Sequence, residues 1–342
     1  MQITTVGLDL AKHVFQVHAV DGAGQVVVRK RLRRTEVLPF FASMSPCLIG
    51  MEACATSHHW ARELIKLGHK VKLMPTYVKA YVKRGKTDAA DAEAICEAVA
   101  RPSMRFVPVK SAEQQSVLML HRVRALLIRQ RTMLVNALRG HLAEFGIIVA
   151  QGISRIRELI AILTDESPDA PLSPLARRAL APLVDQLLDL QPRIRGLEAE
   201  LLAWHRQSQE SRRLETIPGV GFITATAIAA TVPDPSLFRS GREFAAWLGL
   251  TPRPNSSGGK ERLGRISKMG DGYLRTLLVV GATAVIRYAR TKTAAETAWI
   301  SSLLSKKPVR LVSVALANKT ARIAWALLSR GEVYRSATPA GA

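Results

Sequence analysis

Four acidic residues in the N-terminal third of the chain have the types and spacing of a divalent-metal site. Asp9 and Glu52 each stand in an otherwise apolar stretch, where a lone carboxylate is costly to bury unless it is paired, hydrogen-bonded or metal-bound. Asp88 and Asp91 are three residues apart at the start of a predicted helix, so they share one face of its first turn. Such a pair often only caps its helix. All four acids together suit two Mg²⁺ ions about 4 Å apart, which stabilise the attacking and leaving oxygens of a phosphoryl transfer.

A serine-containing loop is the second group with chemical potential. Ser256 and Ser257 lie in a stretch rich in proline and glycine, and four cationic residues follow them: Lys260, Arg262, Arg265 and Lys268. A hydroxyl surrounded by cations could act as a nucleophile toward a phosphodiester. A plain polar linker would have the same composition, so the residues alone leave both interpretations open.

A glycine turn precedes a helix of small residues in the C-terminal part of the chain. The segment Ile217-Pro218-Gly219-Val220-Gly221 is similar to the hairpin of helix-hairpin-helix modules. In those modules, the backbone N–H groups of the glycine turn face a phosphate. A glycine-rich turn between two helices with no ligand would look alike.

The stretch from Ser111 to Phe145 is predicted to form one or two long helices. Its apolar face consists of Leu120, Leu127, Leu134 and Leu138, and five arginines crowd the rest: Arg122, Arg124, Arg129, Arg131 and Arg139. Arginine makes bidentate contacts with phosphate. We therefore predict that this helix binds a nucleic-acid backbone, with a merely solvated charged face as the alternative.

The composition favours an anionic partner. The 342 residues carry 49 Lys and Arg against 27 Asp and Glu, a formal net charge of +22, and 48% are hydrophobic. This excludes a disordered or collagen-like chain and favours nucleic acid over a membrane surface, because no apolar run approaches the about 20 residues of a membrane span. No signal peptide is evident, so we expect a cytoplasmic protein. Cys47, Cys54 and Cys96 support neither a disulfide framework nor a zinc site and are predicted to be ordinary buried thiols.

The charge is unevenly distributed along the chain. Residues 1–110 have a net charge of +8, residues 111–150 of +3, residues 151–208 of −1 and residues 209–342 of +12. Two basic blocks separated by a neutral spacer predict two basic modules joined by a connector. We place the domain with the four acids at 1–110, a helical or coiled-coil region at 111–208 and a C-terminal domain at 209–335. The tail at 336–342 is predicted to be disordered.

The predicted elements place the four acids in an α/β domain. Three hairpin-linked strands open the chain, and helices then alternate with strands, which indicates a mixed sheet covered by helices. The C-terminal domain is predicted to be all-α.

The spacer carries a heptad pattern of apolar residues at alternating steps of four and three: Leu183, Leu187, Leu190, Ile194, Leu197, Leu201 and Trp204. This favours a coiled coil between protomers, with a helix packed on its own chain as the alternative. Pro182 is expected in the first turn of this helix, whereas Pro192 should kink or split it.

Three short motifs make the chain recognisable. GLDLAK, GMEACAT and KTDAADAEAI resemble the motif blocks of the DEDD transposases of bacterial insertion sequences, the IS-one-ten family. The resemblance implies an N-terminal domain similar to the RuvC resolvase, with a ribonuclease-H-like fold, in which Asp9, Glu52, Asp88 and Asp91 bind the metal. One departure is that the family commonly reads EATG where this chain has Glu52-Ala53-Cys54-Ala55.

The C-terminal stretch GLTPR…SSG…R…SK.G resembles the transposase domain of the same family. This implies that Ser257, or the adjacent Ser256, is a catalytic serine that forms a phosphoserine link to DNA. The resemblance further implies donor and target DNA, a structured non-coding bridge RNA, and a dimer or tetramer. The alternatives are a metal-dependent junction nuclease without a covalent serine step and a non-enzymatic nucleic-acid-binding protein.

Overall fold

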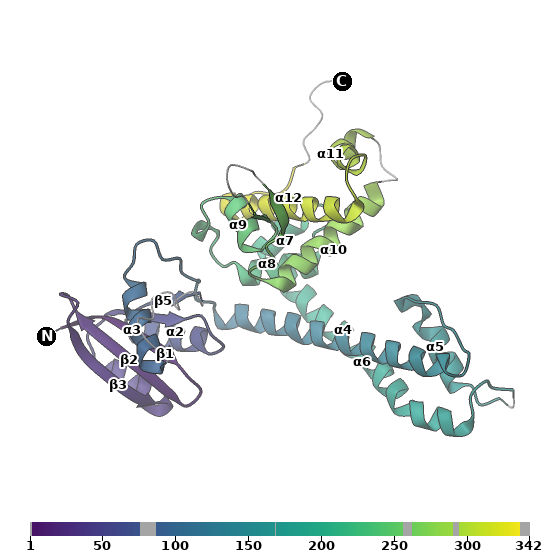
Figure 1. Ribbon diagram of the computed structural model, residues 1–342, viewed down its shortest axis with the longest axis horizontal. Coiled ribbons are helices and arrows are strands. Elements are labelled where there is room, and N and C mark those ends of the chain that lie inside the picture. Colours follow the sequence, from purple (N-terminus) through teal and green to yellow (C-terminus); the bar gives the residue numbers. More distant parts are fainter. Residues whose placement is uncertain (1, 76–86, 168, 256–261, 290–293, 336–342) are drawn as a thin grey trace. The chain divides into compact units, whose positions relative to one another are not determined.

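The computed structural model describes residues 2–75, 87–167, 169–255, 262–289 and 294–335 (Figure 1). The chain divides into two compact units, Met1–Gln115 with Val232–Leu237, and Ser116–Thr231 with Phe238–Ala342. Ser256, Ser257, Lys260 and the tail at 336–342 lie outside the described residues. The domain boundaries at residues 110, 208 and 335, which were drawn from the sequence, remain predictions.

The first unit is built on a five-stranded mixed sheet in the order β3-β2-β1-β4-β5. The first three strands form an antiparallel meander, and β4 and β5 run parallel to β1. The bounds are β1 Ile3–Leu10, β2 Val14–Asp21, β3 Val26–Arg33, β4 Leu48–Glu52 and β5 Lys70–Met74. The predicted mixed sheet covered by helices is confirmed, and it is compatible with a ribonuclease-H-like domain.

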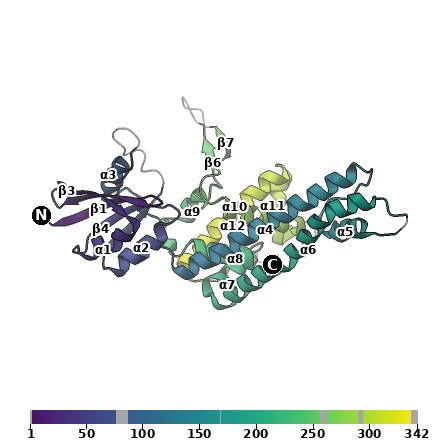
Figure 2. The ribbon, with the colours of Figure 1, turned by 90° about the horizontal axis from the view of Figure 1, so that it is seen from below.

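Helices cover both faces of this sheet (Figure 2). After the short 3₁₀ turn Arg34–Glu36, helices α1 (Val37–Ala42) and α2 (Ser57–Lys66) cover one face, and α3 (Asp88–Val99) covers the other. The buried core on the α1 and α2 side includes Leu8, Phe15 and Met51. Because side chains alternate along a strand, the residues next to these face α3.

The second unit is helical, and its two longest helices, α4 (Ala112–Ala143) and α6 (Pro174–Gln207), lie side by side (Figure 1). The remaining elements are a 3₁₀ turn at Ile153–Arg155, α5 Ile156–Thr164, α7 Gln209–Glu215, α8 Phe222–Thr231, α9 Gly241–Trp247, β6 Pro252–Pro254, β7 Leu263–Ile266, α10 Gly272–Ala289, α11 Ala294–Leu304 and α12 Val309–Arg330. A further 3₁₀ turn, Pro235–Leu237, falls in the segment that belongs to the first unit.

Several residues of the heptad pattern of α6 pack against other helices of the same chain. Leu187 packs in a cluster with residues of α4 and α5, and Leu201 packs in another with Val117 of α4 and Ala230 of α8. This packing agrees with the alternative interpretation, a helix packed on its own protein, and the coiled coil between protomers stays a prediction. The oligomeric state stays a prediction.

The two prolines inside α6 do not end it. The helix begins at Pro174 and runs through Pro182 and Pro192, so Pro182 is not in its first turn and Pro192 does not split it. Each proline removes one backbone hydrogen bond to the residue four positions earlier. Those residues, Arg178 and Leu188, are exposed, so water can reach their carbonyl groups. Burial of the apolar stripe along the helix offsets the rest of the cost.

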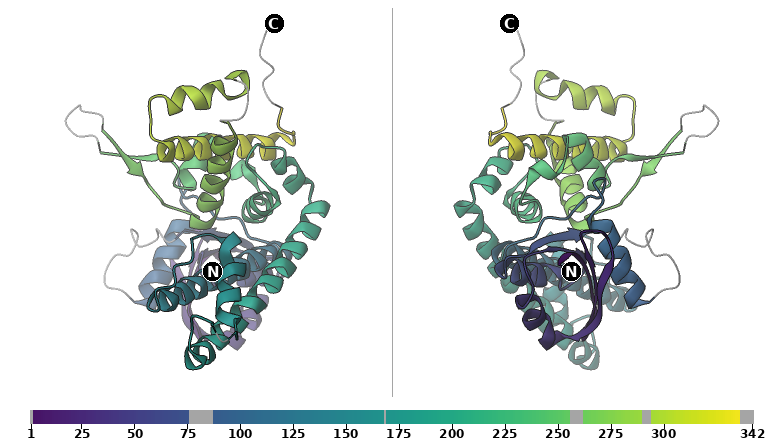
Figure 3. Two further views of the ribbon diagram at one scale, coloured as in Figure 1. Left: turned by 90° about the vertical axis from the view of Figure 1, so that its right-hand side faces the viewer. Right: turned by 90° about the vertical axis from the view of Figure 1, so that its left-hand side faces the viewer.

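The C-terminal region is not all-α, because β6 and β7 form a two-stranded antiparallel ribbon. The ribbon extends away from α12 (Figure 3). Its strands are short and mostly exposed, and β6 contains two prolines, so the local sequence carries no alternating strand pattern. Pairing across the ribbon, which includes the hydrogen bond from Ser267 N to the Thr251 carbonyl oxygen at 2.9 Å, defines it instead.

Among the described residues, α12 is the one helix that is long and apolar enough to cross a membrane by length and composition. At 22 residues, this helix is longer than any uninterrupted apolar run noted in the sequence, because polar residues interrupt it. Its buried side chains include Val312, Ala317 and Ala324, and the helix packs against α9 and α10. The apolar face of α12 therefore contributes to the core of the second unit.

Candidate active site

Two of the four acids lie at the ends of neighbouring parallel strands. In the pairing of β1 with β4, Leu8 lies opposite Met51. The next residues are Asp9 on β1 and Glu52, the last residue of β4. Both carboxylates therefore lie at the same level of the sheet, on the face that α3 covers.

The other two acids lie in the first turn of α3, and neither is its cap. The Thr87 hydroxyl caps the helix by accepting a hydrogen bond from Ala90 N at 3.2 Å. The capping alternative for Asp88 and Asp91 is therefore wrong, and both side chains remain available for another role. Their place in the first turn also agrees with the preference for negative charge at a helix N-terminus.

Two glycines bring α3 close to the sheet near the acids. A Cβ on Gly7 would overlap the backbone of Ala92 and Cys96, and one on Gly50 would lie 2.7 Å from Val99 Cβ. Each glycine precedes an acid by two residues, and therefore lies on the same face of its strand. The sequences Gly7-Leu8-Asp9 and Gly50-Met51-Glu52 thus combine close helix packing with a carboxylate aimed at that side of the sheet.

The electrostatics of Asp9 connect all four acids. Burial and, after it, the negative charges of Asp91, Asp88 and Glu52 together raise the pKa of Asp9 to about 6. Like charges in a partly buried site disfavour ionisation, and a bound cation reverses this effect. In the described part of the chain, no three or more His, Cys, Asp or Glu side chains lie close enough together to hold a metal ion. The donor set itself, four hard carboxylates, fits a divalent cation such as Mg²⁺.

The departure from the family motif after Glu52 does not disturb the backbone. Ala55 stands where the family commonly has glycine, and its φ is not in the left-handed region that would require glycine. The turn is closed by hydrogen bonds from Cys54 N to the Glu52 carbonyl oxygen at 2.8 Å and from the Ser57 hydroxyl to the Cys54 carbonyl oxygen at 2.8 Å.

The three cysteines have no catalytic environment. Cys47 and Cys96 are buried, and burial raises the pKa of each thiol to about 11. Cys54 is only partly buried, contrary to expectation. None of the three forms a disulfide.

Three of the five arginines predicted to bind nucleic acid on α4 have partners inside the protein. Arg124 forms an ion pair with Glu198 at 2.7 Å, and Arg131 donates to the Gln191 side-chain oxygen at 2.7 Å. Arg139 donates to the Ala150 carbonyl oxygen, also at 2.7 Å. These contacts join α4 to α6 and to the turn before α5. Arg122 and Arg129 are exposed and remain candidates for phosphate contacts.

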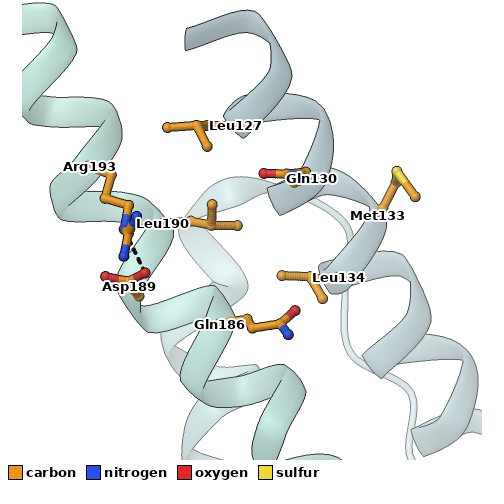
Figure 4. A pocket seen from close by; sticks show the side chains of 8 residues that line it. All are labelled: Leu127, Gln130, Met133, Leu134, Gln186, Asp189, Leu190 and Arg193. Carbon is orange, nitrogen blue, oxygen red and sulfur yellow. Dashed lines mark ion pairs between the residues drawn. The ribbon is translucent and has the colours of Figure 1, made fainter. Parts of the chain in front are cut away.

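A groove of about 470 Å³ separates α4 from α6 (Figure 4). Leu127, Leu134 and Leu190 point into it, and its one cation, Arg193, forms an ion pair with Asp189 at 2.6 Å. This lining offers little attraction for a phosphate. The groove therefore does not extend the predicted nucleic-acid surface of α4.

The glycine turn between α7 and α8 is packed against α10. Gly219 has a φ of +83°, and a Cβ there would lie 2.8 Å from the Gly281 carbonyl oxygen. Gly221 is exposed at the start of α8 with open space around it. The close approach of α10 explains why residue 219 is a glycine. Within this turn, the N-terminus of α8 beside Gly221 remains accessible to a phosphate.

The ribbon positions the chain that enters and leaves the serine loop. Arg262, Arg265 and Lys268 are all exposed on or beside β7, and Lys268 has a φ of +55°. At its base, the Arg275 guanidinium donates to the carbonyl oxygens of Leu248 and Met269, both at 2.9 Å. The sequence did not indicate this anchoring role of Arg275.

A buried polar network that sequence reasoning missed joins α4, α8 and α10. Thr226 Oγ1 donates to the Phe222 carbonyl oxygen at 2.7 Å, so it accepts from His121 Nε2 at 3.0 Å. His121 Nδ1 is then an acceptor for the Tyr273 hydroxyl at 3.0 Å. Burial and the charge of Arg124 lower the pKa of His121 to about 4, so this histidine is neutral at pH 7.

A second missed cluster has the hydrogen-bond order of a hydrolase triad. His205 lies 2.7 Å from the Ser211 hydroxyl through Nδ1 and 2.8 Å from Glu215 through Nε2. Ser211 is fully buried, so no substrate can reach its hydroxyl. The cluster therefore joins α6 to α7 and has a structural role.

Comparison with known proteins gives two family matches. Residues 6–147 match a DEDD transposase family named for IS110, and residues 211–297 match the Transposase IS116/IS110/IS902 family. The first match contains all four acids, and the second contains the ribbon and the glycine turn.

Full-length relatives agree with these matches. The "Probable family 20 transposase" of Pseudomonas aeruginosa is 52% identical over 98% of this chain and 99% of its own length. The transposase for insertion sequence element IS1111A of Coxiella burnetii is 41% identical over 97% of this chain and 92% of its own. The transposase for insertion sequence element IS1328 of Yersinia enterocolitica is 39% identical over 97% and 98%.

Proposed function

The chain belongs to the IS110 family of insertion-sequence transposases, enzymes that cut and rejoin DNA, and from this we propose a mechanism that uses two catalytic groups. The first is the set of four carboxylates Asp9, Glu52, Asp88 and Asp91. The second is Ser257, with Ser256 as the adjacent alternative. The observation that supports the proposal most directly is that burial and the negative charges of the three other acids raise the pKa of Asp9.

The four acids would hold the divalent cations on which the family is expected to depend. Two Mg²⁺ ions fit the donor set and, when bound, would polarise the phosphate and stabilise the charge that develops on the reacting oxygens. The protein residues have distinct tasks. Asp9 and Glu52 are held at the ends of their strands, and the Thr87 cap holds the first turn of α3. Gly7 and Gly50 set the distance between α3 and the sheet.

The serine step conserves the energy of the phosphodiester. Ser257 Oγ loses its proton and attacks phosphorus, the bond from phosphorus to a deoxyribose oxygen breaks, and that oxygen takes up a proton. A phosphoserine diester replaces the DNA phosphodiester. A hydroxyl of the partner strand then attacks the same phosphorus and releases the serine, so rejoining needs no external energy source.

We further propose that a structured bridge RNA pairs with donor and target DNA. The net charge of +22 is large enough to hold RNA as well as DNA, and only 5% of residues are aromatic, which limits base stacking by the protein. Pairing by a guide RNA leaves the protein to recognise backbone and shape. Recombination of two duplexes favours a dimer or tetramer in the bacterial cytoplasm.

The covalent step is tested by trapping the protein on its DNA. Wild-type protein with Mg²⁺ and end-labelled DNA should give a labelled adduct that survives denaturation. Ser257→Ala should abolish the adduct and recombination, and Ser256→Ala serves as the matched variant that distinguishes the two hydroxyls. Cleavage at the normal rate in the double variant would show a junction nuclease without a serine step.

The guide RNA is tested by sequencing the nucleic acid that copurifies with the full-length protein at low salt, where phosphate contacts are strongest. We expect an RNA encoded beside the gene. Recombination by RNA-free protein at the same target would contradict guidance. If Asp9→Asn and Asp91→Asn leave recombination intact, the acids are structural and the protein is not the catalyst.

A further inference from the structure

A basic pocket lies beside the four acids in the first unit. It has a volume of about 360 Å³ and lies between strands β2 and β3 and the first turns of α3. Its lining includes Gln16 and His18 of β2, Arg29, Lys30 and Arg31 of β3, and Thr87, Ala90 and Glu93 at the start of α3. Figure 2 shows the elements involved, with α3 above the β1 to β3 edge of the sheet.

Strand register places this pocket in one row with the catalytic acids. Asp9 pairs with Gln16, and Gln16 pairs with Arg31. The three side chains share the face that α3 covers, because their neighbours Leu8, Phe15 and Leu32 point into the opposite core. At a strand spacing of about 4.8 Å, Arg31 starts about 10 Å from Asp9, and its long side chain can reach back toward it.

Among the residues that line the pocket, Glu93 alone carries a carboxylate. Arg31 is exposed, and neither its guanidinium nor the Gln16 amide has a hydrogen-bond or ion-pair partner among the described residues. Arg29 approaches Glu93 only at 4.0 Å. The start of α3 adds backbone N–H groups and the positive end of a helix dipole. Guanidinium, amide and helix N-terminus together are the donor set that a phosphate requires.

We propose that Gln16 and Arg31, with Arg29 at the outer rim, bind a phosphate of the DNA strand that is cut at the four acids. This phosphate flanks the scissile one and fixes the position of the strand along the row from Arg31 to Asp9. The inference rests on the proposed function, because it takes the acids to be the place of cutting. Gln16 and Arg31 are binding residues that hold the strand in register with the acids.

Strand β3 offers a matched control for loss of charge. Lys30 is also exposed, but it points to the opposite face, where its ammonium lies 5.3 Å from the centre of the Phe40 ring. Arg31→Gln and Lys30→Gln therefore remove equal charge from adjacent positions of the same strand. Lys30 also borders the pocket, but its ammonium group lies over the Phe40 ring, so only Arg31→Gln removes a cation from the proposed phosphate site.

The test measures DNA binding by the full-length protein without Mg²⁺, so that no cleavage occurs. Arg31→Gln should weaken binding about fivefold to tenfold, and it should lower the slope of log affinity against log salt by about 0.7 to 0.9, the value for one phosphate contact. Lys30→Gln should leave both quantities unchanged. Equal effects of the two variants would overturn the site.

Neutral methylphosphonates, placed one at a time along the DNA strand, locate the phosphate. One position beside the cleavage site should weaken wild-type binding as much as Arg31→Gln does, and the variant should lose nothing further there. Additive losses at every position would contradict the proposal, as would a crosslink from Arg31 to RNA alone. DNA that is bound in this way but never cut with Mg²⁺ would refute the proposed function and leave the phosphate site intact.

Discussion

Gly7 of β1 lies so close to the backbone of Ala92 on α3 that a single added methyl group would overlap the Ala92 carbonyl oxygen. Ala92 follows Asp91 directly, and Gly7 precedes Asp9 by two residues. The contact between these two small residues therefore sets how near the acids of the helix come to the acid of the strand.

Gly7→Ala should separate α3 from the sheet and abolish the metal site before it unfolds the protein. We expect at least a tenfold loss of DNA cleavage and a loss of stability of about 1–3 kcal/mol from overpacking, measured by turnover and by denaturant unfolding. Gly140→Ala in α4 is the control, because a Cβ there meets nothing within 4 Å. That control should be neutral or stabilising by up to about 1 kcal/mol. Full activity of Gly7→Ala would show that the separation is not critical.

Mg²⁺ should stabilise the wild-type protein through the four acids. At a concentration a hundredfold above Kd, one bound ion adds about 2.7 kcal/mol, which thermal unfolding with and without EDTA detects as a rise in Tm. Asp9→Asn should remove this rise. It should also leave the metal-free protein at least as stable as wild type, because one of four repelling charges is gone.

Asp185→Asn on α6 is the matched control for that measurement, since Asp185 is exposed and far along the chain from the acids. It should retain the full response to Mg²⁺. An equal response in Asp9→Asn would show that the metal binds elsewhere.

His121 should make the second unit acid-labile. Its pKa is about 4 in the folded protein and about 6.5 when unfolded, so the unfolded chain binds the proton more readily. Its contribution is complete above pH 6.5 and is lost as the pH falls toward 4, by about 3 kcal/mol at 1.36 kcal/mol per pKa unit. Denaturant unfolding between pH 7 and pH 4.5 measures this loss.

The pH effect is assigned to this residue by comparing two variants. His121→Gln should flatten the acid dependence, at some cost in stability at pH 7 because the contacts with Thr226 and Tyr273 are altered. His141→Gln, at an exposed position in the last turn of α4, should keep the wild-type dependence. The same slope in both variants would assign the acid sensitivity to other groups.

Two adjacent leucines of α6 test whether its heptad seam is internal. Leu187 is 2% exposed and Leu188 is 51% exposed. Leu187→Ala should cost about 2–5 kcal/mol, and Leu188→Ala less than about 0.5 kcal/mol. The loss in Leu187→Ala should not depend on protein concentration. A Tm deficit that disappears at high concentration would instead indicate that a second protomer covers the seam.

The sequence was sufficient for features whose signal is local. The acids stood out because each carboxylate interrupts an apolar strand or opens a helix, and the glycine two positions before Asp9 and Glu52 belongs to the same short motif. The meander of β1 to β3 was predictable from hairpin turns and alternation. Each of these features needs only a few consecutive residues.

Features that depend on distant partners were not predictable. Arg124 and Arg131 looked like phosphate ligands because Glu198 and Gln191, which bind them, lie 60 or more residues away. The ribbon β6–β7 is defined by pairing across a loop, and the alignment of Asp9, Gln16 and Arg31 exists only through strand register. The heptad pattern of α6 predicted a helical partner correctly but could not say that α4 of the same chain supplies it.

The base of the β6–β7 ribbon is held by residues of the helical core, which therefore determine the direction of the ribbon. Arg275 clamps the backbone at Leu248 and Met269, and the Asp271 side chain accepts from the backbone N–H of Tyr273 at 2.8 Å. Tyr273 in turn reaches His121 on α4. Hydrogen bonds made by neighbouring residues at the start of α10 therefore connect the base of the ribbon to α4, so a change in the tilt of the ribbon should be felt at His121.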